Sequence, residues 1–142
     1  MLKVGIKKLH PDAVIPKYAK PGDAGLDLTA TEIIKDEAFQ VTYGTGLALE
    51  IPLGYVGLIF PRSSVRNYQI NLSNCVGVID SGYRGEIQLT FNKTGGVPSK
   101  KYDVGDRVGQ IIILPYPEIN FVELDNLSTS VRGEGGFGSS GN

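Results

Sequence analysis

Short runs in which apolar and polar residues alternate recur along this chain, and glycine-containing turns separate them. The alternation is clear in residues 2–7 (LKVGIK), 39–43 (FQVTY), 47–51 (LALEI) and 86–92 (EIQLTFN). A period of two indicates a strand with one solvent-exposed face. Glycine accounts for 19 of the 142 residues, roughly twice its usual share. Many short strands at this spacing predict an all-β domain, either a sandwich or a barrel.

Five other segments complete the secondary-structure prediction. Residues 54–60 (GYVGLIF) form a more continuous apolar run that Pro61 ends. Residues 44–46 (GTG) predict a hairpin turn between two of the alternating strands. Residues 109–115 (GQIIILP) predict a strand buried on both faces, and residues 119–124 (INFVEL) predict a last strand. Helix signals are nearly absent. One short helical turn is expected at residues 63–68 (SSVRNY), with Ser63 as its cap.

Length and charge restrict what the chain can bind. With 142 residues, it is most simply one domain. The 14 basic and 15 acidic residues give a net charge of −1, so we expect no nucleic-acid partner and no anionic membrane surface, which both require a basic excess. The first residues contain no long apolar run. We therefore expect neither a signal peptide nor a membrane span.

Cysteine and histidine are too scarce for several kinds of site. Cys75 is the one cysteine and His10 the one histidine, which excludes an intrachain disulfide and a zinc site built from these residue types. We expect Cys75 to be a small buried hydrophobe rather than a nucleophile. A reducing, cytoplasmic location fits this cysteine usage.

The C-terminal segment 132–142 (RGEGGFGSSGN) contains five glycines together with Arg132 and Phe137. Its glycine spacing fits the dinucleotide-binding and P-loop templates, but both require a following helix. Only four residues follow Gly138, so both templates are rejected. Two interpretations stay open: an idle flexible tail, or a mobile clamp whose backbone N–H groups, arginine and ring hold phosphate and base.

Polar stretches at the predicted strand ends contain the other candidate residues. Arg62 with Ser63 beside it suits a phosphate, although a capped turn also explains this pair. The stretches comprise residues 23–28 (DAGLDL), 61–67 (PRSSVRN), 73–86 (SNCVGVIDSGYRGE) and 105–110 (GDRVGQ).

Asp80 is the candidate general base, because it directly follows the apolar Val78 and Ile79. A turn aspartate is an equally simple explanation. Asp27 fits a solvent-facing edge position, and Arg107 is better explained as an ion-pair partner than as a ligand. Taken together, the stretches indicate a nucleotide or another phosphorylated ligand. A triphosphate would bring its own Mg²⁺.

The order of these stretches resembles the trimeric dUTPases, which convert dUTP to dUMP and pyrophosphate. All five family motifs are recognisable between residues 21 and 141: DAGLDLTA, PRSS, GVIDSGYRGE, GDRVGQIIILP and RGEGGFGSSG. The resemblance implies an antiparallel β jelly roll in residues 1–131 and a flexible lid in residues 132–142. It also implies a homotrimer in which all three chains build each site. The activity that the resemblance implies would keep uracil out of DNA and supply dUMP for thymidylate synthesis.

The resemblance assigns a role to individual residues as well. Asp80 would activate the water that attacks the α-phosphorus, and Asp27 would hold waters bound to Mg²⁺, which the triphosphate mainly carries. Tyr83 would pack against deoxyribose and exclude a 2′-hydroxyl. Arg132 would meet the γ-phosphate, and Phe137 would stack on uracil. The positions that match substrate contacts are Arg62, Ser63, Ser64, Asn74, Val78, Ile79, Tyr83, Gln88, Gln110, Arg132, Phe137, Gly138 and Ser139.

Departures from the family pattern are small. Ser64 and Gly109 stand where glycine and alanine are usual, and Ser140 where threonine is common. Two alternatives remain: a dCTP deaminase-like or bifunctional nucleotide enzyme of the same fold, and a non-catalytic jelly-roll protein that binds partners. The deaminases carry a catalytic glutamate at the position of Thr90, which disfavours the first alternative. An intact Asp80 with Arg62 and Arg132 disfavours the second.

Overall fold

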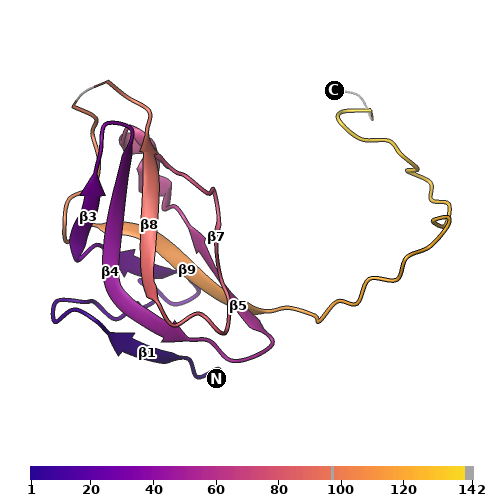
Figure 1. Ribbon diagram of the computed structural model, residues 1–142, viewed down its shortest axis with the longest axis horizontal. Helices are drawn as coiled ribbons and strands as arrows, with labels where there is room; N and C mark the ends of the chain where they lie inside the picture. Colours follow the sequence, from indigo (N-terminus) through magenta and orange to yellow (C-terminus); the bar gives the residue numbers. More distant parts are fainter. Residues whose placement is uncertain (97, 140–142) are drawn as a thin grey trace.

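Antiparallel strands dominate the computed structural model, which describes residues 1–96 and 98–139 (Figure 1). The elements are β1 (Gly5–Lys8), β2 (Leu26–Thr29), β3 (Glu32–Asp36), β4 (Gln40–Glu50), β5 (Tyr55–Phe60), the 3-10 helix η1 (Ser63–Asn67), β6 (Ile70–Leu72), β7 (Gly77–Ile79), β8 (Glu86–Lys93) and β9 (Arg107–Pro115). The prediction of an all-β domain with one short helix is confirmed.

The strands form two sheets that share one core. One sheet has the order β1-β4-β8-β6, with β3 also paired to β4, and the other has the order β2-β9-β5-β7. Within each sheet, every pair of neighbouring strands is antiparallel. Tyr43, Leu89 and Phe91 from the first sheet join Ile59 and Ile111 from the second in a single buried cluster. The two sheets therefore pack face to face as a sandwich.

The hairpin predicted at residues 44–46 is wrong, because these residues lie inside the continuous strand β4. The pairing of β4 with β8 shifts its register after Gly44, and Gly46 has a positive φ of 64°. The Thr45 hydroxyl donates to the carbonyl of Ile87 at 2.7 Å, and the Gly46 N–H donates to the Glu86 carboxylate at 2.7 Å. These bonds hold a β-bulge, which bends a strand instead of reversing it.

The strand predicted at residues 119–124 is also absent. After β9 ends at Pro115, the chain leaves the sandwich as a long extension (Figure 1), and residues 116–139 contain neither helix nor strand. Apolar side chains along this extension are exposed to solvent: Phe121 is 92% exposed and Leu127 is 84% exposed. Within residues 1–96 and 98–139, no strand lies beside this apolar-rich run for it to pair with.

The helical turn after β5 is confirmed, but its cap is not Ser63. η1 begins at Ser63, its N-cap residue is Arg62, and no side chain caps it through a hydrogen bond. Within residues 1–96 and 98–139, no helix is long and apolar enough to cross a membrane.

Cys75 is exposed, so the prediction of a buried thiol is wrong for this chain. It lies in the tight turn between β6 and β7, where its φ is +61°. Its N–H donates to the carbonyl of Leu72 at 3.0 Å. This turn geometry directs the residue away from the core.

Candidate active site

Three of the polar stretches meet at one end of the four-stranded sheet. Strand β9 lies between β2 and β5, and Gln110 pairs with Asp27 on one side and with Phe60 on the other. Residues that follow Phe60 are therefore brought beside residues far away in the sequence. The pocket formed there, called here the phosphate pocket, is lined by Ala19, Asp23, Ala24, Gly25, Asp27, Arg62, Ser63, Arg107, Gln110 and Ile112.

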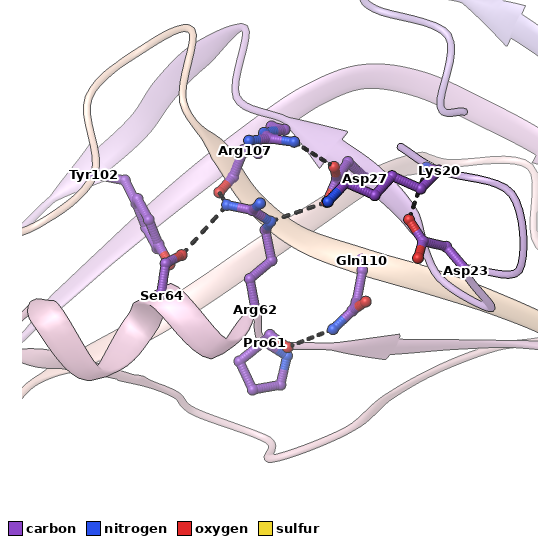
Figure 2. Close-up of polar contacts among 9 residues, drawn as sticks. All are labelled: Lys20, Asp23, Asp27, Pro61, Arg62, Ser64, Tyr102, Arg107 and Gln110. Carbon is purple, nitrogen blue, oxygen red and sulfur yellow. Dashed lines mark hydrogen bonds and ion pairs between the residues drawn. The ribbon is translucent and has the colours of Figure 1, made fainter. Parts of the chain in front are cut away.

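The carboxylate of Asp27 is shared by two arginines in this pocket (Figure 2). Arg62 Nε donates to Oδ1 at 2.9 Å, and Arg107 Nη1 donates to Oδ2 at 2.8 Å. The side chains of Asp27 and Arg62 are only 21% and 24% exposed, whereas that of Arg107 is 51% exposed. The interpretation of Arg107 as an ion-pair partner is confirmed. Charge-assisted hydrogen bonds of this kind fix the orientation of a guanidinium group.

Arg62 is also held from its other side (Figure 2). Its Nη1 donates to Ser64 Oγ at 3.3 Å and to the carbonyl of Arg107 at 3.4 Å. Ser64 Oγ in turn lies 3.3 Å from the hydroxyl of Tyr102, a residue that is only 2% exposed. Ser63 lines the pocket, while the Ser64 hydroxyl is directed at Arg62 and Tyr102.

Gln110 has the partner that a polar side chain beside an apolar strand requires. Its Nε2 donates to the carbonyl of Pro61 at 3.0 Å (Figure 2). Gly25 lies directly against this amide, because a Cβ added there would meet the end of the Gln110 side chain. This close approach links the first and fourth polar stretches, and sequence analysis did not find it.

Asp80 lies at a second, separate pocket. Val78, Ile79, Asp80, Tyr83, Glu86 and Gln88 line it. Strand β7 belongs to one sheet and β8 to the other, so the turn between them crosses the edge of the sandwich. The predicted turn is confirmed, and the Tyr83 N–H donates to the carbonyl of Asp80 at 3.1 Å to close it.

This turn is fixed by two side chains of its own. The Tyr83 hydroxyl donates to the carbonyl of Glu86 at 3.0 Å. Arg84 Nη1 donates to the carbonyls of Ser81 at 2.6 Å and Tyr83 at 3.1 Å. Sequence analysis missed Arg84, whose one signal was its position inside the turn. With its hydroxyl engaged, Tyr83 presents its ring, and the side chain of Val78 is 61% exposed.

Asn74 and the C-terminal residues are not brought to either pocket by this chain. Asn74 is exposed in the loop before β7. Residues 132–139 lie at the far end of the extension (Figure 1), where Arg132, Gly135, Gly136, Gly138 and Ser139 line a hollow of their own. Phe137 is fully exposed. Ser140 lies outside the described residues.

Asp80 and Arg62 lie toward opposite ends of β5. Ile79 pairs with Gly57, so Asp80 lies toward the start of β5, whereas Arg62 lies two residues beyond Phe60, the last residue of that strand. At about 3.3 Å per residue, the two backbones are separated by roughly 20 Å. One chain therefore keeps its candidate base well apart from its candidate phosphate-binding arginine.

Acidic side chains in the phosphate pocket are few. Asp23 accepts a bond from the Lys20 N–H at 2.8 Å, and Asp27 is engaged by two arginines. Among residues 1–96 and 98–139, no group of three or more histidine, cysteine, aspartate or glutamate residues could hold a metal ion. These donors suit a cation that arrives with its ligand better than a metal held by the protein alone.

An antiparallel β-sandwich, an arginine-lined pocket and a carboxylate-bearing turn fit the class of jelly-roll enzymes that hydrolyse nucleotides. A family model described as dUTPase matches residues 12–141. The chain belongs to the dUTPase family, and its fold is the jelly roll of that family. The match favours this assignment over a deaminase. Thr90, the residue that disfavours a deaminase in the sequence, shares a hydrogen bond with the hydroxyl of Thr42 at 2.9 Å.

Individual relatives agree with the family match. A deoxyuridine 5′-triphosphate nucleotidohydrolase from Thermobifida fusca (strain YX) is 42% identical, over 99% of this chain and 79% of the relative. One from Gloeobacter violaceus is 40% identical, over 99% of this chain and 97% of the relative. The solved structure of the Staphylococcus bacteriophage 80alpha dUTPase with dUpNHpp superposes with a TM-score of 0.83, at 26% identity, and covers 100% of both chains.

Proposed function

We propose that this protein hydrolyses dUTP to dUMP and pyrophosphate, with Asp80 as the base that activates the attacking water. The observation that carries the proposal is the position of Asp80, in a turn fixed by Tyr83 and Arg84 and beside the exposed side chain of Val78. A general base must be rigidly placed within hydrogen-bond reach of its water. Membership of the dUTPase family supplies the reaction that this carboxylate would serve.

The Asp80 pocket suits uracil and deoxyribose. Val78 and Ile79 end an antiparallel strand of only three residues, so backbone groups at its end are available to read the base edge. A tight backbone wall around the base would leave no room for the methyl group of thymine, and cytosine would present a different hydrogen-bond edge. The Tyr83 ring would pack against the sugar and leave no room for a 2′-hydroxyl. Gln88 borders the same pocket.

The phosphate pocket suits the triphosphate. The Nε and Nη1 atoms of Arg62 are engaged within the protein, which orients the guanidinium and leaves Nη2 for a phosphate oxygen. Ser63 and Gln110 line the same pocket and provide a hydroxyl and an amide. Donors fixed in this way stabilise charge on a transferring phosphoryl group without reorganising.

Mg²⁺ would enter with the triphosphate and neutralise part of its charge. Asp27 is the residue that would accept hydrogen bonds from water on the ion. Each of its oxygens already accepts one guanidinium bond, but a carboxylate has about four acceptor positions. One lone pair on each oxygen is therefore left for such a water, so Asp27 fits this role.

The complete site would be assembled in a homotrimer. Asp80 and Arg62 of one chain are separated by roughly 20 Å along β5, which is too far for both to act on the same triphosphate. Pairing the turn of one chain with the phosphate pocket of another brings them together. The exposed apolar side chains of residues 116–131 suit a neighbour's surface, which would place the lid, residues 132–142, over that neighbour's site.

Turnover of dUTP, dTTP, dCTP and UTP tests the function directly. We expect pyrophosphate from dUTP and little turnover of the other three nucleotides. Release of ammonia from dCTP would instead indicate a deaminase, and binding without any product would indicate a non-catalytic protein. Asp80→Asn should bind dUTP yet hydrolyse it about 10²–10⁴-fold more slowly. Asp12→Asn, which changes an exposed carboxylate, is the matched control and should leave the rate unchanged.

A further inference from the structure

Arg107 reaches the phosphate pocket through a defect in its strand. Asp27 pairs with Gln110 and Leu28 with Gly109, but Thr29 pairs with Arg107, so the register skips Val108. Regular alternation would place Val108 on the outer face with Gln110 and turn Arg107 inward. Instead Val108 is completely buried. A β-bulge re-aims side chains in this way, and here it brings Arg107 to the face that carries Asp27.

Arg107 also sets the charge balance of the pocket. The charged residues in the pocket lining are Asp23, Asp27, Arg62 and Arg107, two acidic and two basic. The pair formed by Asp27 and Arg62 is neutral by itself. Without Arg107, the pocket would carry an acidic excess and repel a triphosphate.

We propose that Arg107 is a positioning residue of the phosphate pocket. By binding Oδ2 of Asp27, it fixes the carboxylate whose Oδ1 orients Arg62, and it offsets the charge that Asp27 adds. Its own carbonyl accepts a second bond from Arg62 at 3.4 Å. The inference rests on the proposed function, because it takes this pocket as the binding site of the phosphates.

The test is a double-mutant cycle on Arg107 and Asp27. The variants are Arg107→Gln, Asp27→Asn and the pair, and the readouts are the Kd of a non-hydrolysable dUTP analogue with Mg²⁺, the Kd of deoxyuridine, and Tm. We expect Arg107→Gln to weaken binding of the analogue about tenfold and to leave deoxyuridine binding and Tm unchanged. In the Asp27→Asn background, the same change should add less than about twofold, because coupled residues are not additive.

Two further variants separate charge from position. Arg107→Lys keeps the charge and should recover most of the affinity for the analogue. Arg66→Gln removes an exposed arginine of η1 outside the pocket lining and should bind like the wild type, although it changes the net charge equally.

Each contrary result has a clear meaning. Fully additive effects would show that Arg107 contacts phosphate itself and would overturn the positioning role. An equal loss of deoxyuridine and analogue binding, with a lower Tm, would reduce Arg107 to a fold-stabilising residue. Unchanged affinity for the analogue in Arg107→Gln would overturn the positioning role. Failure of the wild type to bind the analogue would count against the proposed function instead.

Discussion

Asp80 and Arg62 lie at opposite ends of strand β5, one at each of two separate pockets. Asp80 follows the residue that pairs with Gly57, and Arg62 follows Phe60 at the other end of the strand. Each is rigidly held, Asp80 by its turn and Arg62 by Asp27 and Ser64. Rigid groups that cannot reach one another in one chain can still act together across subunits, and the proposed closed trimer would supply that geometry.

Sugar selection should depend on the ring of Tyr83 and not on its hydroxyl. The hydroxyl donates to the carbonyl of Glu86, so the ring faces the pocket. Tyr83→Ala should raise the ratio of UTP to dUTP turnover roughly tenfold, because the space for a 2′-hydroxyl opens. Tyr83→Phe keeps the ring and should keep the wild-type ratio. Identical ratios in Tyr83→Ala and the wild type would place sugar selection elsewhere.

Ser64 should act by holding Arg62. Its hydroxyl bridges Arg62 Nη1 and the buried Tyr102. Ser64→Gly should raise the KM for dUTP about three- to tenfold and change kcat less. Tyr102→Phe removes the same bridge from its other end and should shift KM in the same direction. A KM that responds to Ser64→Gly but not to Tyr102→Phe would indicate a direct contact between Ser64 and phosphate.

Low pH should weaken the ion pairs of Asp36 with Lys93 and Lys101, which lie at the five-stranded sheet. Hydrogen bonds from Lys101 and then Lys93 hold the pKa of Asp36 below its usual value. A lowered folded-state pKa adds stability above the unfolded value, near 4, and this stability is lost as pH falls through the folded pKa. Asp36→Asn should therefore lower Tm at pH 7, and its difference from the wild type should shrink below about pH 4. A constant difference across this range would contradict the assignment.

The lid should close over bound triphosphate. Its five glycines make ordering costly, at roughly 1–2 kcal/mol of backbone entropy per residue, so only contacts with a full triphosphate would offset the cost. Deletion of residues 132–142 should remove most hydrolysis and preserve the trimer. The chain has no tryptophan, so Phe137→Trp provides one reporter. Its emission should respond to a non-hydrolysable dUTP analogue with Mg²⁺ and less to dUMP, while equal responses would contradict lid closure.

Local sequence patterns predicted the strands and the turn that carries Asp80, because alternation and glycine-rich turns reflect local physics. The local patterns failed at residues 44–46, because glycines occur in a bulge as readily as in a hairpin. Hydrogen bonds to the distant residues Glu86 and Ile87 determine that these residues form a bulge. They failed again at residues 119–124, since an apolar-rich run does not reveal whether a partner strand exists in the same chain.

The residue types that line the phosphate pocket were predictable from the sequence, but their positions relative to one another were not. The sequence placed Arg62, Asp27 and Arg107 in separate stretches, and only the pairing of β2, β9 and β5 brings them together. The position of Arg107 depends on the bulge beside Val108, which no local signal revealed. The bond from Arg107 to Asp27 follows from that bulge.

Mixing two inactive variants tests the shared site most directly. Asp80→Asn loses the base and Arg62→Gln loses the phosphate-binding arginine, so neither trimer alone should hydrolyse dUTP at an appreciable rate. In trimers reassembled from equal amounts, an unmutated Asp80 of one subunit meets an unmutated Arg62 of another. Each mixed trimer then contains one intact site, and random assembly should restore about a quarter of wild-type activity. Mixed trimers that form, bind dUTP and stay inactive would contradict the account.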